Sequence, residues 1–319
     1  MEPVRRAVID VGTNSIKLLI ADVGAGGVQP VWESSRQTRL GRSFYKTHRL
    51  QPEPILQTAQ AVAEFAAKAH TEGATSVRVI ATSAARDAVN TSDLVSAIQE
   101  TCGLPVEIIS GATEADWAFR GVATDPHLTE SPLLLLDVGG GSTEFILGHG
   151  QERSFCESFR IGTVRMLEQF PHSDPPTRAE LTTCRDAVQT VLREQVGPKL
   201  SPLISAGSAL LAIQPIQLIG TGGTASILGC MESKLTAFDR AKIEGTRLSR
   251  DRVTWHVDHL WGLPLELRKR VVGLPPNRAD VILTGAVIYE MVMEFFRFEH
   301  LRITTRGLRF AALMDPGEL

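Results

Sequence analysis

Apolar runs and amphipathic stretches alternate along the whole chain. Residues 133–136 are four consecutive leucines followed by Asp137, and an uninterrupted apolar run of this kind is typical of a buried strand. Residues 52–70 carry apolar side chains at helical spacing, which predicts a helix. A second long helix is predicted from Thr177, as its N-cap, to about Val196. This alternation of strands and helices predicts an α/β fold.

Each half of the chain opens with the same predicted three-stranded pattern. We expect strands at 4–11, 15–23 and 28–33 in the first half and at 133–138, 143–148 and 151–159 in the second. The turn between the first two strands has the sequence Asp-Val-Gly-x-x-Ser in both halves, at 10–15 and 137–142. Two copies with identical spacing indicate a duplication. The pattern therefore predicts two α/β domains that face a cleft.

A short polar segment with prolines, residues 125–132, separates the two predicted halves. This composition is typical of a linker. We therefore place the first domain at residues 1–125 and the second at residues 126–319, with the last helix as a candidate to pack back on the first domain. The length of 319 residues also favours two domains over one.

The paired glycine turns are candidate phosphate-binding loops. Glycine backbones can close their N–H groups on an anion, and the polar side chains of the loops add further donors. A single loop of this kind is as often purely structural, whereas two facing loops would clamp a phosphate chain from both sides. The candidate ligands are Gly12, Thr13, Asn14 and Ser15 in the first loop and Gly139, Gly140, Gly141, Ser142 and Thr143 in the second.

A third glycine segment, residues 221–224, lies where a predicted strand meets the start of a helix. The N-terminus of a helix is a natural anion site, so Gly222 and Thr224 are further candidates for phosphate binding.

Magnesium is the metal expected with bound phosphates, and it takes few carboxylates and several waters. The carboxylates beside the glycine loops are Asp10, Asp137 and Glu144.

Two further side chains have both a structural and a functional interpretation. Arg86 follows the strand predicted at 76–81, where ligands bind in open α/β sheets; it is either a phosphate clamp or the partner of Asp87. Glu114 lies in the first turn of the helix predicted at 113–122, where it either complements the helix dipole or accepts a proton from water. The residues alone leave both alternatives open.

The composition, with 43% hydrophobic and 22% charged residues, is that of an ordinary globular protein. The net charge of −3 gives no general attraction to nucleic acid or anionic membranes. Basic contacts to a polyanion would therefore be local, and Arg36, Arg39 and Arg42 are one candidate patch, with a solvated basic loop as the alternative. The four cysteines lack the spacing of a zinc site or a disulfide framework.

The apolar segment 206–219 is interrupted by Gln214, Pro215 and Gln217, so we do not expect it to span a membrane. Because the N-terminal residues do not resemble a signal peptide, we expect a cytoplasmic protein.

Taken together, the motifs resemble those of the exopolyphosphatase/guanosine pentaphosphate phosphohydrolase (Ppx/GppA) family, within the acetate kinase, sugar kinase, Hsp70 and actin superfamily. The similarity runs from residue 9 to about residue 309 and covers nearly the whole chain. The segments that resemble family motifs are residues 9–15, 82–90, 109–115, 136–144, 220–224 and 278–280. The resemblance implies two duplicated ribonuclease H-like (actin-like ATPase) α/β domains that face a central cleft.

The resemblance also implies roles for individual residues. Glu114 matches the catalytic glutamate of the family, and Arg86 lies in the segment that carries a phosphate-binding arginine. Arg309 matches a retained arginine near the end and is expected to bind substrate. The positions that depart from the family pattern are Thr113, which replaces the first of two glutamates, and Arg306 and Phe310.

We therefore expect an exopolyphosphatase that releases terminal orthophosphate from inorganic polyphosphate, with Glu114 activating water and Mg²⁺ near Asp137 and Glu144. Short chains are favoured because the sequence resembles the short, two-domain class of the family. The alternatives are a guanosine pentaphosphate phosphohydrolase, an acetate- or sugar-type kinase, and a non-catalytic sensor of guanosine tetra- or pentaphosphate, which Thr113 keeps open. Neither nucleic acid nor a membrane is expected as a partner, and a homodimer is one expected assembly.

Overall fold

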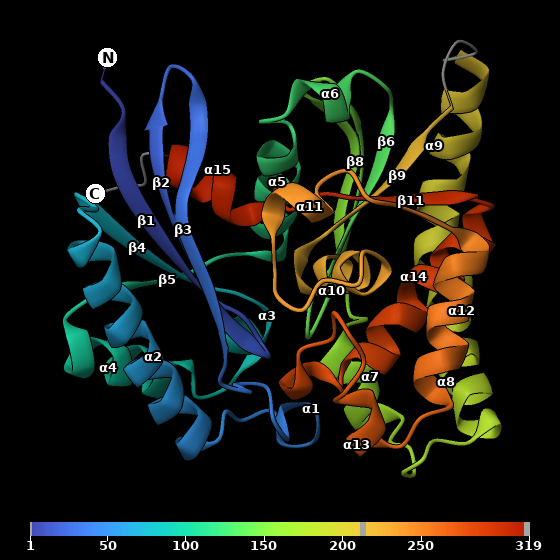
Figure 1. Ribbon diagram of the computed structural model, residues 1–319, viewed down its shortest axis with the longest axis horizontal. Helices are drawn as coiled ribbons and strands as arrows, with labels where there is room; N and C mark the ends of the chain where they lie inside the picture. The colour runs from blue at the N-terminus through green and yellow to red at the C-terminus, as the bar shows by residue number, and fades with distance from the viewer. Residues whose placement is uncertain (1, 211–214, 316–319) are drawn as a thin grey trace. The chain divides into compact units, whose positions relative to one another are not determined.

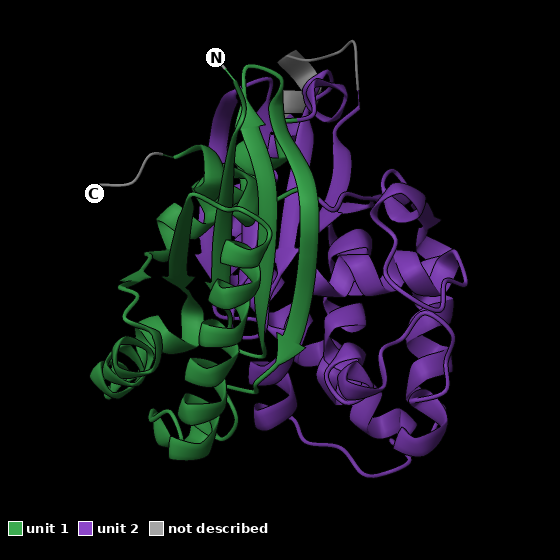
Figure 2. Cartoon of the chain, turned by 60° about the vertical axis from the view of Figure 1, so that its left-hand side comes forward, with its two compact units in different colours: residues 1–124, 306–319 green, residues 125–305 purple. Residues whose placement is uncertain are grey.

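The computed structural model describes residues 2–210 and 215–315, and its helices and strands are shown in Figure 1. Residues 211–214, within the apolar segment 206–219, lie outside the described part. The chain divides into two compact units, residues 1–124 with 306–319 and residues 125–305 (Figure 2). None of the helices in the described part is both long and apolar enough to cross a bilayer.

The first unit is built on a five-stranded sheet in the order β3-β2-β1-β4-β5. Strands β1 to β3 form an antiparallel meander, and β4 and β5 continue the sheet in parallel with β1. Its elements are β1 (Val4–Val11), β2 (Ser15–Gly24), β3 (Gly27–Gln37), α1 (Phe44–Thr47), α2 (Pro52–Thr71), β4 (Ser76–Ala81), α3 (Ser83–Asp87), α4 (Thr91–Cys102), β5 (Val106–Ile108), α5 (Gly111–Val122) and α15 (Leu308–Met314).

Helices cover both faces of this sheet, so the central strand β1 is apolar on both sides. Ile9 packs in one cluster with residues of α2 and α4, while its neighbour Val8 packs in another with residues of α5 and α15. A strand buried on both faces has a continuous rather than an alternating apolar sequence, which explains the consecutive apolar residues Ala7, Val8 and Ile9 in β1.

The second unit contains a six-stranded sheet in the order β10-β11-β9-β6-β7-β8. Its elements are α6 (Pro126–Thr129), β6 (Leu133–Val138), β7 (Thr143–His149), β8 (Glu152–Phe159), α7 (Thr163–Gln169), α8 (Arg178–Val191), a π-helical turn (Leu192–Val196), α9 (Gly197–Leu210), β9 (Gln217–Thr221), α10 (Gly222–Glu232), α11 (Arg240–Ile243), β10 (Arg247–Ser249), α12 (Arg250–Trp261), α13 (Leu265–Arg268), a 3₁₀ turn (Pro276–Arg278), α14 (Ile282–Phe296) and β11 (His300–Ile303).

The two sheets have the same topology. From its meander outward, the second sheet runs β8-β7-β6-β9-β11, which repeats the order of third, second, first, fourth and fifth strand found in the first unit. Strand β10 is an addition at the edge, antiparallel to β11. The predicted duplication of an α/β fold is therefore confirmed.

The helix predicted to end near Val196 continues beyond it. Thr177 forms the expected capping box with Glu180 at the start of α8. At the other end, the π-helical turn Leu192–Val196 carries the chain past Pro198 into α9. A π turn shifts the hydrogen-bond register, and no local signal in the sequence predicts it.

Helix α15 belongs to the first unit and packs closely on α5. A Cβ atom on Gly121 would lie 1.9 Å from the carbonyl oxygen of Gly307, so only glycine permits this approach. Arg306 donates to Thr124 Oγ1 at 2.7 Å, and its guanidinium lies 5.3 Å from the ring centroid of Phe310. Arg306 and Phe310, the two positions near the end that the resemblance leads us to expect as departures, therefore contact each other.

We expect Gly121→Ala to destabilise the protein by about 1–3 kcal/mol, the usual cost of overpacking, because the added methyl group overlaps the Gly307 backbone. Thermal unfolding should show a midpoint several degrees lower than that of the wild type. Gly26→Ala is the control, since a Cβ there meets no atom within 4 Å. Equal midpoints for the two variants would contradict the assigned contact.

Candidate active site

The two predicted phosphate loops share one backbone geometry. In the first loop, Gly12 N donates to Ser15 O at 3.0 Å, and in the second Gly139 N donates to Ser142 O, also at 3.0 Å. A Cβ on Gly12 would lie 2.9 Å from the Ser15 oxygen. The turn therefore requires glycine at this position in order to close.

The first loop contains three buried polar atoms that lack a hydrogen-bond partner among the described residues: Asp10 Oδ1, Asn14 Nδ2 and Ser15 Oγ. Their side chains belong to residues that are only 7%, 6% and 4% exposed. A buried polar group without a partner costs about 1–3 kcal/mol. Such a group is therefore retained where a ligand completes it.

Asp10 is the charged member of this group. Burial raises the pKa of its carboxyl, while the nearby cations of Lys17 and Arg309 act in the opposite direction. Lys17 is the direct cross-strand partner of Asp10 in the β1–β2 pair. The site therefore combines a buried carboxylate with two cations, one of which is the predicted Arg309.

In the second loop, the carbonyl groups of all three glycines accept hydrogen bonds from the start of α7. The bonds are Thr163 N to Gly139 O at 2.9 Å, Val164 N to Gly140 O at 2.8 Å and Arg165 Nε to Gly141 O at 2.7 Å. A Cβ on Gly162 would lie 2.6 Å from Ser142 N. The start of α7 therefore packs directly against the loop backbone.

These bonds determine where the loop N–H groups point. In a trans peptide, the C=O of one residue and the N–H of the next point in opposite directions. With the three carbonyls directed at α7, the N–H groups of Gly140, Gly141 and Ser142 face away from it. Successive amides directed to one side form an anion-binding concavity.

The first loop is held in the same manner by the segment that follows β3. Gly41 N donates to Thr13 O at 2.7 Å, and Arg39 N donates to Asn14 O at 3.0 Å. The N–H groups of Asn14 and Ser15 are consequently directed away from this segment. Both loops thus present amides for an anion, although different elements support them.

Asp137 and Glu144 form the candidate magnesium site. They are direct partners in the β6–β7 register, which places both carboxylates on one face of the sheet. Glu144 is 1% exposed, and its Oε1 accepts a hydrogen bond from Ser158 Oγ at 2.7 Å. Two like charges in this position repel each other, so a cation would stabilise the pair.

The available donors suit a metal that keeps most of its waters. Among the described residues, no group of three histidine, cysteine or acidic side chains is placed to hold a metal ion. Magnesium is bound through one or two carboxylates together with water and substrate oxygens, and the Asp137–Glu144 pair fits this chemistry.

The third glycine segment lies against the second loop. A Cβ on Gly222, which has φ 83°, would lie 2.1 Å from Asp137 Oδ1, so the carboxylate packs on the glycine backbone. Thr224 Oγ1 donates to Val138 O at 3.2 Å, and this hydroxyl joins the two segments. Thr143 is fully buried and donates to Ile161 O at 2.6 Å, which is a structural contact.

Arg86 and Glu114 form an ion pair. Arg86 Nη1 lies 3.0 Å from Glu114 Oε2, whereas Arg86 Nε is 3.7 Å from Asp87. The Arg86 side chain also donates to Ile109 O at 3.0 Å, which fixes its position. Ala84 N donates to Thr13 Oγ1 at 3.2 Å, so α3, which carries Arg86, is joined to the first loop.

Thr113, beside Glu114, takes part in the cap of α5. Its backbone N–H donates to Ser110 Oγ at 3.0 Å, and its hydroxyl lies 2.8 Å from the same oxygen. Thr113, where the resemblance leads us to expect a glutamate, therefore takes part in the helix start that carries Glu114.

Arg309 and two arginines of the candidate basic patch form contacts with other residues of the chain. Arg309 Nη1 donates to Leu18 O at 3.0 Å. In the proposed basic patch, Arg36 pairs with Glu64 at 2.6 Å and Arg42 pairs with Glu53 at 2.5 Å. Arg36 lies on β3 rather than in the predicted loop, and Arg42 lies in the segment that follows it. Their ion pairs favour the structural interpretation of this patch.

Lys17 was not among the residues predicted from the sequence, although it occupies the position of Glu144 when the two Asp-Val-Gly-x-x-Ser motifs are superposed. In each unit this residue is the cross-strand partner of the motif aspartate, Asp10 or Asp137. Extending the comparison of the two motifs by two residues would have revealed it.

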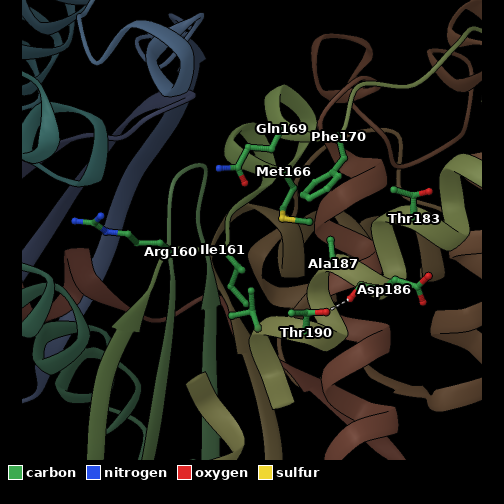
Figure 3. Close-up of a pocket in the computed structure, with 10 residues that line it drawn as sticks. Arg160, Ile161, Met166, Gln169, Phe170, Thr183, Asp186, Ala187 and Thr190 are labelled. Carbon is green, nitrogen blue, oxygen red and sulfur yellow. Dashed lines mark hydrogen bonds between the residues drawn. The ribbon is translucent and has the colours of Figure 1, made fainter. Parts of the chain in front are cut away.

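A cavity of about 500 Å³ lies elsewhere in the second unit, between the end of β8 and helices α7 and α8. Figure 3 shows Met166 and Phe170 close together, while the Arg160 side chain extends away from them. The cavity does not include any of the predicted phosphate ligands, but Ile161, which accepts the Thr143 hydrogen bond, forms part of its wall.

Comparisons with known proteins agree with this architecture. The sequence model of the Ppx/GppA phosphatase family matches residues 19–315. Exopolyphosphatase 2 of Mycobacterium tuberculosis is 37% identical over 301 residues, which cover 90% of this chain and 89% of the relative. The crystal structure of the Aquifex aeolicus Ppx/GppA family member is 29% identical, with a TM-score of 0.76 over 98% of this chain and 96% of that one. An exopolyphosphatase structure from Cytophaga hutchinsonii is 25% identical, with a TM-score of 0.83 over 97% and 96%.

Asp10→Asn is expected to raise the thermal midpoint at about pH 7. Because burial raises the pKa of Asp10 from 3.8, the folded chain binds this proton more tightly than the unfolded chain. Stability is therefore lost as pH rises from the unfolded value through the folded one. Unfolding scans from about pH 4 to pH 8 should show the advantage of the variant growing with pH.

Asp22→Asn is the matched control with the opposite sign. The hydrogen bond from Arg5 lowers the pKa of Asp22, so this carboxylate stabilises the fold above its unfolded pKa, and its removal should lower the midpoint at neutral pH. A lower midpoint for Asp10→Asn at neutral pH would show that its carboxylate is not the destabilising charge inferred here.

Proposed function

The chain belongs to the Ppx/GppA phosphatase family, and we propose that it is an exopolyphosphatase that releases terminal orthophosphate from inorganic polyphosphate. The observation that carries the proposal is the first loop, in which three buried polar atoms lack partners among the described residues, joined through α3 to the Arg86–Glu114 pair. The oxygens of a phosphoryl group would accept hydrogen bonds from two of these atoms, Asn14 Nδ2 and Ser15 Oγ. The Glu114 carboxylate is the proposed base that accepts a proton from water.

In this proposal the chain's own groups bind, orient and accept a proton. Asn14 Nδ2, Ser15 Oγ and the loop amides bind oxygens of the substrate, and Arg86 adds a positive charge. Glu114 orients a water molecule and accepts its proton as the water oxygen attacks the terminal phosphorus. The bond from that phosphorus to the bridging oxygen breaks, and the electron pair remains on the shortened chain.

Magnesium, when bound near Asp137 and Glu144, would supply positive charge that offsets the charge on the phosphate oxygens. Ser158 holds Glu144 in position through its hydroxyl group.

We propose polyphosphate rather than guanosine pentaphosphate as the substrate because the relative at 37% identity is an exopolyphosphatase. We expect short chains to be favoured as substrates. Arg36 and Arg42 of the candidate basic patch are paired with glutamates, so they are not available to bind the distant phosphates of a long chain.

Glu114→Gln should lower the rate of phosphate release by about 10²–10⁴-fold, the usual contribution of a positioned acid or base, while substrate binding is largely kept. Release is measured without an acceptor from short polyphosphate, long polyphosphate, guanosine pentaphosphate and ATP. Glu107→Gln is the control, because this exposed carboxylate pairs with Arg78 on the same unit. Near-normal turnover by Glu114→Gln would refute its assignment as the base.

The same assay distinguishes the other functions. Release from guanosine pentaphosphate but not from polyphosphate would identify the nucleotide as the substrate. A kinase would need an acceptor, and a sensor would bind its ligand without turnover.

Ser158→Ala should raise the magnesium concentration needed for half-maximal activity by about 10-fold, the usual effect of removing a group that orients a metal ligand. Activity is titrated with MgCl₂ after removal of metal with a chelator. Ser154→Ala on the same strand is the control, since Ser154 Oγ donates to Leu147 O instead. Unchanged magnesium dependence in Ser158→Ala would argue against metal binding by Glu144.

A further inference from the structure

We propose that Gln37 is a positioning residue that orients the Asn14 side-chain amide so that its Nδ2 group donates to a phosphate oxygen. The inference rests on the proposed binding of phosphate by the first loop. It begins from the hydrogen bond in which Gln37 Nε2 donates to Asn14 Oδ1 at 3.1 Å.

The register of the sheet places Gln37 beside the first loop. It is the last residue of β3 and the cross-strand partner of Ser15, the residue after Asn14. The Asn14 backbone is fixed as well, because its carbonyl oxygen accepts from Arg39 N at 3.0 Å. Burial of Asn14, which is 6% exposed, restricts its side chain further, so the main remaining choice is which end of the amide faces Gln37.

That rotation determines what the loop offers to a ligand. With Oδ1 bound to Gln37, Nδ2 is directed elsewhere, and it is buried without a partner among the described residues. An amide pair has a second self-consistent arrangement, in which glutamine accepts and asparagine donates. This arrangement would direct Asn14 Oδ1, an acceptor, at a phosphate anion.

The phosphate-binding arrangement is thus the one in which Gln37 donates. Neutral glutamine can donate or accept, whereas the isosteric carboxylate of glutamate only accepts. Gln37→Glu would therefore bind Asn14 Nδ2 and turn the wrong end of the amide toward the substrate.

The test is a double-mutant cycle between Gln37→Glu and Asn14→Ala, with phosphate release from short polyphosphate as the assay. We expect Gln37→Glu to lower kcat/KM by about 10–100-fold, mostly through KM, as for a lost hydrogen bond to a charged group. In the Asn14→Ala background the same substitution should have less than about a 3-fold effect, because no amide remains to be turned. An equal loss in both backgrounds would indicate a direct charge effect and overturn the proposal.

Gln37→Met provides a neutral variant of similar length. Methionine removes the hydrogen bond to Asn14 Oδ1 but offers no acceptor that would reverse the orientation of the Asn14 amide. The kcat/KM of Gln37→Met should therefore lie between that of the wild type and that of Gln37→Glu. A loss with Gln37→Met as large as that with Gln37→Glu would show that packing, rather than orientation, is responsible.

Stabilisation by tripolyphosphate, measured as a thermal shift, separates this inference from the proposed function. If the wild type is stabilised but releases no phosphate, hydrolysis is refuted, and a smaller shift in Gln37→Glu than in the wild type still supports the orientation of Asn14. If the wild type hydrolyses polyphosphate and Gln37→Glu is unaffected, only the role of Gln37 is overturned. If the wild type is neither stabilised nor active, both fail.

Discussion

The anchoring of the loop carbonyl groups is the constraint on which both candidate phosphate sites depend. In each unit, the segment after the third strand or at the start of the next helix supplies N–H donors to the carbonyls of the glycine loop. The planar peptide then directs the following amides to the opposite side. Anion binding is therefore built into the backbone. In the proposed function, the side chains of Asn14, Ser15, Arg86 and Glu114 would add specificity and chemistry to it.

The duplication keeps this backbone and changes its charge. In the first unit the motif aspartate, Asp10, lies across from Lys17, whose opposite charge offsets part of the cost of burying the carboxylate. In the second unit the corresponding aspartate, Asp137, lies across from Glu144, and the pair has two negative charges. At the position across from the motif aspartate, the first unit has a lysine and the second a glutamate. The first pair therefore has opposite charges, whereas the second has like charges that a cation would stabilise, which is consistent with different roles for the two loops.

The sequence predicted the parts of the structure that local patterns encode. The duplicated sheets follow from the two Asp-Val-Gly-x-x-Ser motifs. It did not predict Gln37 or Ser158 as partners of site residues, because such contacts depend on strand register, which brings together residues 23 positions apart in one case and 14 in the other. Nor did it predict the continuation of α8 through a π turn, since the hydrogen-bond shift has no sequence signature. The family resemblance, rather than the local pattern, favoured a functional role for Glu114.

The return of α15 to the first unit has a consequence for how the protein is made. Residues 125–305 form a continuous unit, whereas the first unit needs residues after 305 to complete it. On the ribosome, the middle of the chain emerges before α15 does. Until then, Val8 and Leu19 can pack with Trp117 of α5, but they lack Leu308 and Phe310, which complete the cluster on this face of the sheet. The segment translated first is thus the last to finish folding, which reverses the N-to-C order in which domains usually fold during synthesis.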